Sequence, residues 1–170
     1  MRVLRGYNAD VMDFVAKRMP PMFGESIREA GRFVGFGVID ESGTMQAGII
    51  YNEYQPQFSN IMVHLAADTP RWATHGIIKE ILGYAFVEIG LHKVWGSTPN
   101  HLTRVLRFNS GIGFRQEGVI RDHYGPGRHA VVTGMLAKEY RKFYIDNGCV
   151  QALRQHRAKM RPLMEMKEAA

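Results

Sequence analysis

The segment from Ala66 to Leu91 constrains the fold more than any other part of this sequence. Apolar residues recur through its second half at the spacing of one helix face, with charged residues between them; these positions are Ile77, Ile78, Ile81, Leu82, Ala85, Phe86 and Ile89. The apolar run from Ile61 to Ala67 is typical of a buried strand, and Gly90 stands where a left-handed helix cap is expected. The sequence therefore predicts a strand, a short polar loop and a long helix.

The start of this helix is a candidate site for an anion. A helix N-terminus presents backbone N–H groups without intrahelical partners, and the helix dipole adds partial positive charge. Gly76 lies in the first turn, and Arg71 in the preceding loop can supply a fixed charge. Many strand–loop–helix units bind nothing, so a purely structural loop is the alternative.

The loop resembles a known motif. The order Arg71-x-x-Thr74-x-Gly76, between a strand and a helix, is similar to the pyrophosphate loop of the GNAT superfamily, the acetyl-CoA-dependent N-acetyltransferases. Thr74 stands where the first glycine of that loop is usual. The resemblance implies a mixed α/β fold with a mostly antiparallel central sheet flanked by helices.

A second block strengthens the resemblance. Asn100-x-x-Thr103, followed by an apolar helix and residues 113–118 (Gly-Phe-Arg-Gln-Glu-Gly), is similar to the Asn-x-x-Ser and Gly-Phe-x-x-Glu-Gly block of the family. That block is strongest in the branch that acetylates protein N-termini, including those of ribosomal proteins, and small amines. The resemblance covers roughly residues 1–145.

Hydrophobic patterns and turn residues predict the remaining elements. Strands are expected over 2–7, 32–40, 45–54, 59–67 and 92–98, and a last hairpin over 114–122 and 128–136. Helices are expected after a cap at Asn8, over 24–30, and after a cap at Asn100. The predicted organisation is one acetyltransferase domain, 1–145, and a basic, helical C-terminal extension, 146–170.

Composition indicates the class of protein and its expected location. A chain of 170 residues with 45% apolar and 22% charged residues is ordinary for a soluble globular domain. It has no run long enough to cross a membrane and no signal-peptide pattern. Cys149 is the only cysteine and has no partner for an internal disulfide, so a cytoplasmic location is expected. A packing role for Cys149 is preferred to a catalytic thiol, because no base is visible near it in the sequence.

The net charge of +6 suits an anionic cofactor and would also suit nucleic acid. The basic tail lacks the aromatic residues that stack on bases, so a solvated helix face is the preferred interpretation and a nucleic-acid partner is not expected. Tyr140, Phe143 and Tyr144 share one helical face that needs a cover, either from the domain itself or from a second subunit. Relatives in the family often pair, and we therefore expect a homodimer that uses part of this extension.

The resemblance assigns the cofactor site. Acetyl-CoA is expected to bind its pyrophosphate at the loop and helix start, chiefly through backbone amides, and to contact Asn100 and Thr103; the loop residues are Arg71, Thr74, His75, Gly76 and Ile77. Backbone groups at Leu65, Ala66 and Ala67 are expected to pair with the pantetheine arm and to supply the oxyanion donors, where the family's strand separates from its parallel neighbour. No metal is expected.

Acetyl transfer also needs a base and an acid. Glu53 and His64 are the candidate bases, and deprotonation through water is the alternative; an ordinary histidine pKa near 6.5 suits proton removal. Many relatives place a tyrosine on the helix after the Asn100 position, but none lies between Asn100 and Phe114 here. Thr103 is therefore the candidate donor to the departing sulfur, with Tyr124 as a more distant alternative.

These observations predict an N-acetyltransferase that moves an acetyl group from acetyl-CoA to a primary amine, a protein N-terminus or a small amine, by direct transfer in a ternary complex. One alternative is a non-catalytic acyl-CoA-binding or protein-interaction module of the same fold. Another is a nucleic-acid-binding or modifying protein, which only the charge and the tail suggest.

Overall fold

The computed structural model describes residues 1–29 and 31–146, which belong to two compact units. The first unit is Met1–Ser97, and the second begins at Thr98. The predicted basic extension, 146–170, lies outside the described residues from 147 onward, and so does Cys149.

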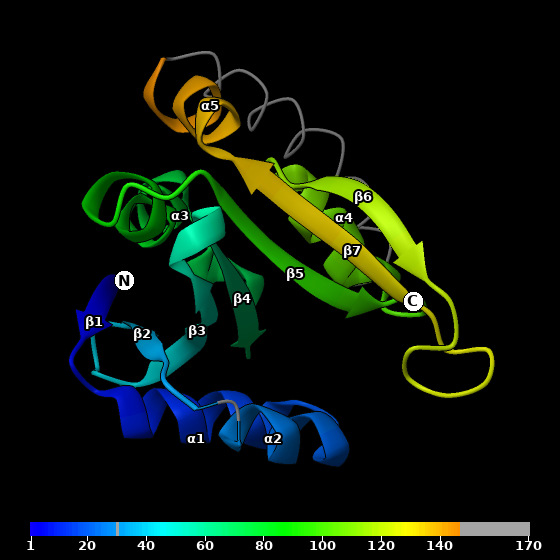
Figure 1. Cartoon of the computed structure of the whole chain (residues 1–170). Helices are drawn as coiled ribbons and strands as arrows, with labels where there is room; N and C mark the ends of the chain where they lie inside the picture. Colours follow the sequence, from blue (N-terminus) through cyan, green and yellow to red (C-terminus); the bar gives the residue numbers. More distant parts are fainter. Residues whose placement is uncertain (30, 147–170) are drawn as a thin grey trace, which may run out of the picture. The chain divides into compact units, whose positions relative to one another are not determined.

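The first unit is built on a twisted sheet (Figure 1). Its strands are β1 (Arg2–Arg5), β2 (Val34–Ile39), β3 (Met45–Gln55), β4 (Asn60–Ala67) and β5 (Lys93–Pro99), and they lie side by side in that order. The pairs from β1 to β4 are antiparallel, whereas β4 and β5 are parallel. The mixed α/β class with mostly antiparallel pairing is therefore confirmed.

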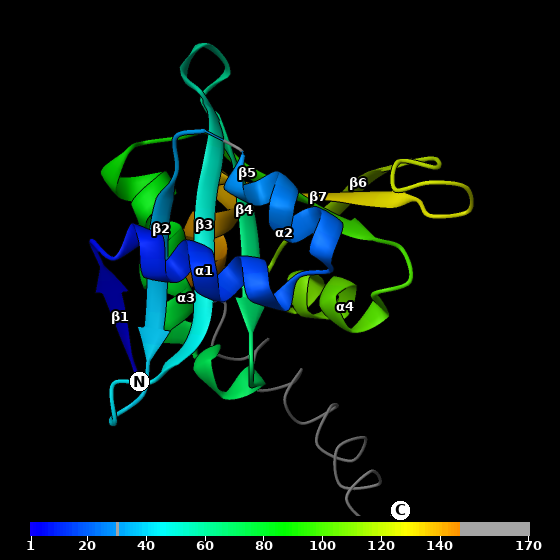
Figure 2. The same cartoon turned by 90° about the horizontal axis from the view of Figure 1, so that it is seen from below.

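Two helices, α1 (Asn8–Arg18) and α2 (Pro21–Arg28), cover one face of the sheet (Figure 2). As predicted, Val11, Phe14 and Val15 face inward and join a buried cluster with Ile50 of β3. Glycines on the strands make room for α1: a β-carbon on Gly48 would lie 2.7 Å from Cγ2 of Val15. We call this the α1 face of the sheet.

The predicted role of Asn8 as a helix cap is wrong. Tyr7 occupies the cap position, and Asn8 is already helical. Its side-chain oxygen instead accepts a hydrogen bond, 2.9 Å long, from the backbone N–H of Gly35 in β2. The Asn8 side chain therefore links α1 to β2 and does not cap α1.

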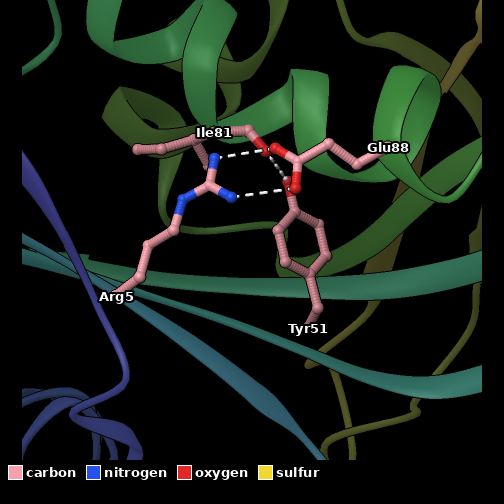
Figure 3. Close-up of polar contacts among 4 residues, drawn as sticks. All are labelled: Arg5, Tyr51, Ile81 and Glu88. Carbon is pink, nitrogen blue, oxygen red and sulfur yellow. Dashed lines mark hydrogen bonds and ion pairs between the residues drawn. The ribbon is translucent and has the colours of Figure 1, made fainter.

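The opposite face carries α3 (His75–Gly83), which continues into a π-helical turn, η3 (Tyr84–Glu88). The Tyr51 hydroxyl donates to the Ile81 carbonyl over 3.0 Å. Arg5 of β1 binds Glu88 through both terminal nitrogens, at 2.9 and 2.8 Å (Figure 3). These contacts fix the middle and the C-terminal end of the helical segment to the sheet.

The π turn changes which residues of this segment are buried. Ile77 to Phe86 follow the predicted apolar face, and Gly90 adopts the expected positive φ of 78°. Ile89, however, is 36% exposed, contrary to the predicted pattern. Its N–H bonds to the carbonyl of Tyr84, five residues earlier, and this wider turn moves Ile89 away from the sheet.

The second unit contains α4 (Thr103–Gly111), the hairpin of β6 (Arg115–Ile120) and β7 (Ala130–Leu136), and α5 (Ala137–Tyr140), which continues as a π turn, η4 (Arg141–Ile145). The hairpin turns through Gly125-Pro126-Gly127 as predicted, with positive φ at both glycines.

The chain itself covers the aromatic face of the last helix. Tyr140 and Tyr144 are buried and stack with their centroids 5.4 Å apart. The Tyr144 hydroxyl donates to the Ile112 carbonyl over 2.7 Å, and Phe143 lies against Gly113. This part of the chain therefore needs no second subunit to bury the face.

Within the described ranges, no helix is long and apolar enough to cross a membrane.

Candidate functional site

The candidate site begins where β4 and β5 stop pairing. Their parallel register covers three residue pairs, from Asn60 with Lys93 to Met62 with Trp95. The strand β4 continues to Ala67 and remains paired with β3 over that length. A β-carbon on Gly96 would lie 2.9 Å from the Val63 carbonyl oxygen, so the two strands are still close at that point. The last residues of β4 thus lie beyond the β4–β5 ladder.

The direction of the backbone N–H groups alternates along β4, and this alternation determines which of them point toward β5. The N–H of Asp68 donates to the Gln46 carbonyl of β3. Because hydrogen-bonding directions alternate along an antiparallel strand, the N–H groups of Ala66 and His64 also point toward β3. The N–H groups of Leu65 and Ala67 point the other way, toward the β5 side. Of the three predicted oxyanion positions, these two have the required direction.

The loop that follows is held by its own short-range contacts. The Thr69 hydroxyl accepts a hydrogen bond from the N–H of Arg71, and the 3₁₀ turn η2 (Pro70–Trp72) places Trp72 in the core at 3% exposure. The N–H of Thr74 donates to the Trp72 carbonyl over 2.8 Å. The side chain of Arg71 is exposed. The loop, which these hydrogen bonds hold, therefore presents the exposed Arg71 side chain beside the helix start.

Thr74 caps α3. Its hydroxyl accepts a hydrogen bond from the N–H of Ile77 over 3.3 Å. Two of the amides predicted to bind pyrophosphate, those of Thr74 and Ile77, are thus hydrogen-bonded within the chain. His75 is the first helical residue, and Gly76 is the second. The N–H of Gly76 therefore has no acceptor within the helix, because the helix has no residue one turn earlier.

The surroundings of Gly76 fit an approaching phosphate. A β-carbon built on Gly76 meets no atom within 4 Å, and the residue is exposed. An anion can therefore reach the backbone at this position, where the helix dipole favours negative charge. The open backbone at Gly76 and the positive end of the helix dipole therefore suit an anionic group such as a phosphate.

An ion pair ties the beginning of this loop to α1. Arg18 donates to both carboxylate oxygens of Asp68 over 2.6 Å, and its guanidinium lies over the Phe14 ring. The hydrogen bonds from Arg18 hold the pKa of the Asp68 carboxyl below its usual range.

His64 lies on the α1 face, in the middle of β4. Its register partner is Ile50, which belongs to the core beneath α1 and α2. His64 Nε2 is 3.0 Å from Oδ1 of Asn52. Burial lowers the pKa of His64 from its ordinary value of 6.5 to about 4. The ring is therefore neutral at pH 7: Nε2–H donates to Asn52, and Nδ1 remains an acceptor.

Glu53 lies elsewhere. It occupies an irregularity of β3 after Asn52, with a φ of 48°, and its side chain is exposed. Asn52 pairs with Met62, five residues before Ala67. At about 3.3 Å per residue, this position is on the order of 17 Å from the strand end where the oxyanion donors are expected. The structure does not bring Glu53 and that strand end together.

Two asparagines on the α1 face, Asn52 and Asn60, were assigned no role from the sequence pattern. Asn52 is 2% exposed and holds His64, while Asn60 accepts a hydrogen bond from Nε1 of Trp95 over 3.2 Å. An asparagine inside an otherwise apolar strand, as in Ile50-Tyr51-Asn52, was the available signal, because a buried amide requires a partner.

Asn100 and Thr103 belong to the second unit. The prediction that Asn100 caps the following helix is wrong: Leu102 is the cap residue, and the N–H of Asn100 donates to the His129 carbonyl over 3.0 Å. Thr103 is the first residue of α4 and is exposed. Tyr124 lies in the hairpin loop, where its N–H donates to the Arg128 carbonyl.

No group of three or more metal-ligating side chains gathers among the described residues.

Solved structures with a similar fold include spermidine N-acetyltransferases. A chimera of SpeG from Vibrio cholerae and hSSAT has a TM-score of 0.64 and 13% identity, covering 82% of this chain and 98% of that chain. A point mutant of SpeG has a TM-score of 0.64 and 14% identity, covering 82% and 97%. SpeG in complex with manganese ions has a TM-score of 0.62 and 14% identity, covering 82% and 94%.

No protein-family model and no curated protein matches the sequence. The structural likeness, at these identities, concerns the fold. The chain has the fold of the GNAT acetyltransferases, as its sequence motifs predicted.

Proposed function

We propose that this protein is an N-acetyltransferase that transfers the acetyl group of acetyl-CoA directly to a primary amine in a ternary complex. The observation that carries the proposal is the end of the β4–β5 ladder at Met62, followed by a hydrogen-bonded loop and a helix start that is open at Gly76. This combination offers strand amides to an acyl-pantetheine arm and a helix N-terminus to a pyrophosphate.

The residues of the first unit have distinct roles in the proposal. Arg71 and the start of α3, from Thr74 to Ile77 with His75 and Gly76 between them, hold the pyrophosphate. A bound phosphate oxygen can replace the Thr74 hydroxyl as acceptor for the Ile77 amide. The N–H groups of Leu65 and Ala67 stabilise the oxyanion that develops as the amine nitrogen bonds to the carbonyl carbon.

Proton removal occurs through water in this proposal. A histidine with a pKa of about 4 is a weak base toward an ammonium group, whose α-amino form has a pKa of about 7.7–8.0. His64 instead accepts a hydrogen bond from the neutral amine through Nδ1 and orients its lone pair. Glu53, at the far end of β3, is an alternative that would attract a cationic acceptor. Thr103 and Asn100 are proposed to contact the cofactor, with Thr103 donating to the departing sulfur.

The cofactor site is tested by Arg71→Ala. Removing a charged hydrogen-bond donor should weaken CoA binding by about 1.5–3 kcal/mol, or roughly 10- to 150-fold in Kd. Gly76→Val should weaken it further, because the side chain would fill the open space beside the backbone. Isothermal titration calorimetry with CoA measures both effects, and Arg2→Ala on the exposed side of β1 is the matched control. An unchanged Kd in Arg71→Ala would remove the loop from the site.

A second candidate is an acyl-CoA-binding module without catalysis. The lack of a tyrosine between Asn100 and Phe114 favours it, because the usual proton donor of many relatives has no counterpart there. CoA release measured with a panel of amines, beside the CoA titration, separates the two candidates. Binding without turnover on any amine identifies the module.

A further inference from the structure

We infer that Asn52 is a positioning residue for the acceptor amine: its side chain holds the proton of His64 on Nε2, so that Nδ1 accepts a hydrogen bond from the amine. The inference rests on the proposed function, because it concerns the acceptor of the same reaction. It gives a role in the site to a buried side chain of β3, which acts through His64.

Asn52 and His64 lie on neighbouring strands, on the face of the sheet that α1 and α2 cover (Figure 2). Asn52 is opposite Met62 in the β3–β4 register, and His64 is opposite Ile50, so the two residues are diagonal neighbours. Long side chains can meet across such a diagonal, and Nε2 of His64 lies 3.0 Å from Oδ1 of Asn52. The strand register therefore sets this hydrogen bond.

The two side chains differ in burial. Asn52 is 2% exposed, whereas His64 is half-buried. A buried amide that loses its hydrogen-bond partner is destabilising, so Asn52 keeps its contact with the imidazole. A ligand can reach the ring of His64 but not the side chain of Asn52. Asn52 can therefore influence a bound amine only through His64.

The amide oxygen selects one tautomer of the imidazole. Oδ1 of Asn52 is a hydrogen-bond acceptor, so the ring nitrogen that faces it carries the proton. With this proton on Nε2, Nδ1 of the neutral ring has a lone pair and acts as an acceptor. The other tautomer would bring the lone pairs of Nε2 and Oδ1 together and would leave a buried acceptor unpaired. Asn52 thus makes Nδ1 an acceptor for the N–H group of a ligand.

Asn52 also favours the neutral imidazole, because a carboxamide carries no charge. A carboxylate in this position would stabilise the imidazolium form and raise the pKa of His64. Beside the amide, burial lowers that pKa from 6.5 to about 4. Near neutral pH, His64 therefore accepts a hydrogen bond and does not take up a proton.

The charged side chains of the neighbouring elements are paired, exposed or far along the sheet. Asp68, after β4, is bonded to Arg18 of α1, and Asp13 of α1 is bonded to Arg28 of α2. The other charged side chains in the described part of α1, the α2 segment and β3 are exposed; they are Asp10, Lys17, Glu25, Glu29 and Glu53. Lys93 of β5 is opposite Asn60, four residues before His64. Solvent screens exposed charges, so the hydrogen bond to Asn52 is the contact that determines the tautomer.

This arrangement suits the hydrogens of a primary amine. The neutral amine has two N–H groups and one lone pair. As the nitrogen bonds to the acetyl carbonyl carbon and the carbon–sulfur bond breaks, one amine proton leaves to water, the sulfur takes up a proton, and the other N–H stays in the amide product. The N–H that stays can donate to Nδ1 of His64 throughout. It orients the lone pair without a proton transfer to the ring.

The tautomer is measured by ¹⁵N NMR of the full-length protein labelled at histidine, with His64→Gln to assign the His64 signals. At pH 7 we expect a protonated Nε2 and an unprotonated Nδ1 in the wild type. Asn52→Leu should give a mixture of both tautomers, because the acceptor of the Nε2 proton is lost. A protonated Nδ1 in the wild type would overturn the inference.

Asn52→Asp keeps the size of the side chain and serves where Asn52→Leu does not fold. It should keep the proton on Nε2 and raise the pKa of His64 by about 1–3 pH units, because a carboxylate favours the imidazolium. The matched control is Asn60→Asp, which adds the same charge on the same face, about 13 Å along β4 from His64. It should leave the tautomer and the pKa unchanged, and an equal rise in both variants would overturn the inference.

Titration of glycinamide into CoA-saturated protein at about pH 9, where an α-amino group is mostly neutral, measures the contact with the amine. The Nδ1 signal of His64 should move upfield as its lone pair accepts a hydrogen bond. Asn52→Leu should raise the Kd of glycinamide about 2- to 10-fold and leave the CoA Kd unchanged, because one tautomer cannot accept from the amine.

CoA release, measured with acetyl-CoA in place of CoA, separates the inference from the proposed function. Movement of the Nδ1 signal without CoA release would support the inference and remove the catalytic proposal. An unmoved Nδ1 signal, or an equal Kd of glycinamide in Asn52→Leu, would overturn the inference whether or not CoA is released.

Discussion

At the scale of single residues, burial determines what His64 can do. The same imidazole that would titrate near neutrality in water is neutral down to acidic pH in β4, because burial disfavours its charged form. A decline in activity between about pH 8 and 6 would therefore report the protonation of the amine and not of His64.

The depressed pKa also predicts a change in stability with pH. Above about pH 6.5 His64 is neutral in both the folded and the unfolded chain; as the pH falls, the unfolded chain takes up a proton that the folded chain refuses until about pH 4. The free energy of unfolding should fall by roughly 2 kcal/mol between pH 7 and pH 5 from this group. Urea unfolding of the wild type and His64→Gln at both pH values measures the difference, and an equal loss in both proteins would contradict it.

The two predicted helix N-caps are both wrong, whereas the predicted C-terminal cap at Gly90 has the expected positive φ. Asn8 and Asn100 both precede apolar helical patterns, yet neither caps its helix. The oxygen of Asn8 bonds to Gly35, 27 residues away. A local rule compares a side chain only with its neighbours in sequence, so it cannot detect a distant partner that competes for the same oxygen.

At the scale of elements, Thr74 has a role in α3 that can be separated from ligand binding. Thr74→Ala should lower the free energy of unfolding by about 1 kcal/mol, or about 2–4 °C in Tm, because the Ile77 amide loses its acceptor. Thr74→Gly should cost only a few tenths of a kcal/mol. It should bind CoA at least as tightly as the wild type, since the Ile77 amide can then turn to the phosphate.

Thermal unfolding and CoA titration of these two variants give the measurements. Weaker CoA binding in Thr74→Gly than in the wild type would show that the hydroxyl itself contacts the phosphate. An unchanged Tm in Thr74→Ala would show that the cap contributes nothing to stability.

The spacing of apolar residues predicted the elements well, because buried side chains recur with the period of the helix or strand that carries them. The apolar face from Ile77 to Phe86 and the inward face of α1 are both observed. The prediction fails at Ile89 because the π turn contains one more residue than an α-helical turn. The spacing of apolar residues in the sequence does not mark that extra residue. The end of the β4–β5 pairing could be expected only from the family, because backbone separation requires no particular side chain.

At the scale of the whole molecule, the homodimer remains a prediction. We expect light scattering of the full chain at micromolar concentration to give the mass of two copies, and a chain that ends at residue 146 to associate more weakly. A shorter truncation at Arg141 would be misleading, because it removes Tyr144, whose hydroxyl bonds to Ile112, and Phe143, which lies against Gly113.

A full-length monomer would exclude the dimer. A dimer that survives removal of residues 147–170 would place the interface elsewhere. The next surface to examine is β6, which pairs with β7 alone in the described part of the chain and exposes Val119 and Ile120.

The Arg18–Asp68 ion pair has a thermodynamic consequence. It joins α1, which covers the sheet face that carries His64, to the residue that precedes the loop of Arg71. Under the proposed function, a substrate that shifts either partner would change the conformational equilibrium of the other, and acetyl-CoA and the amine would be coupled through this contact. Linkage requires that coupling to be reciprocal: the factor by which CoA alters amine affinity must equal the factor by which the amine alters CoA affinity.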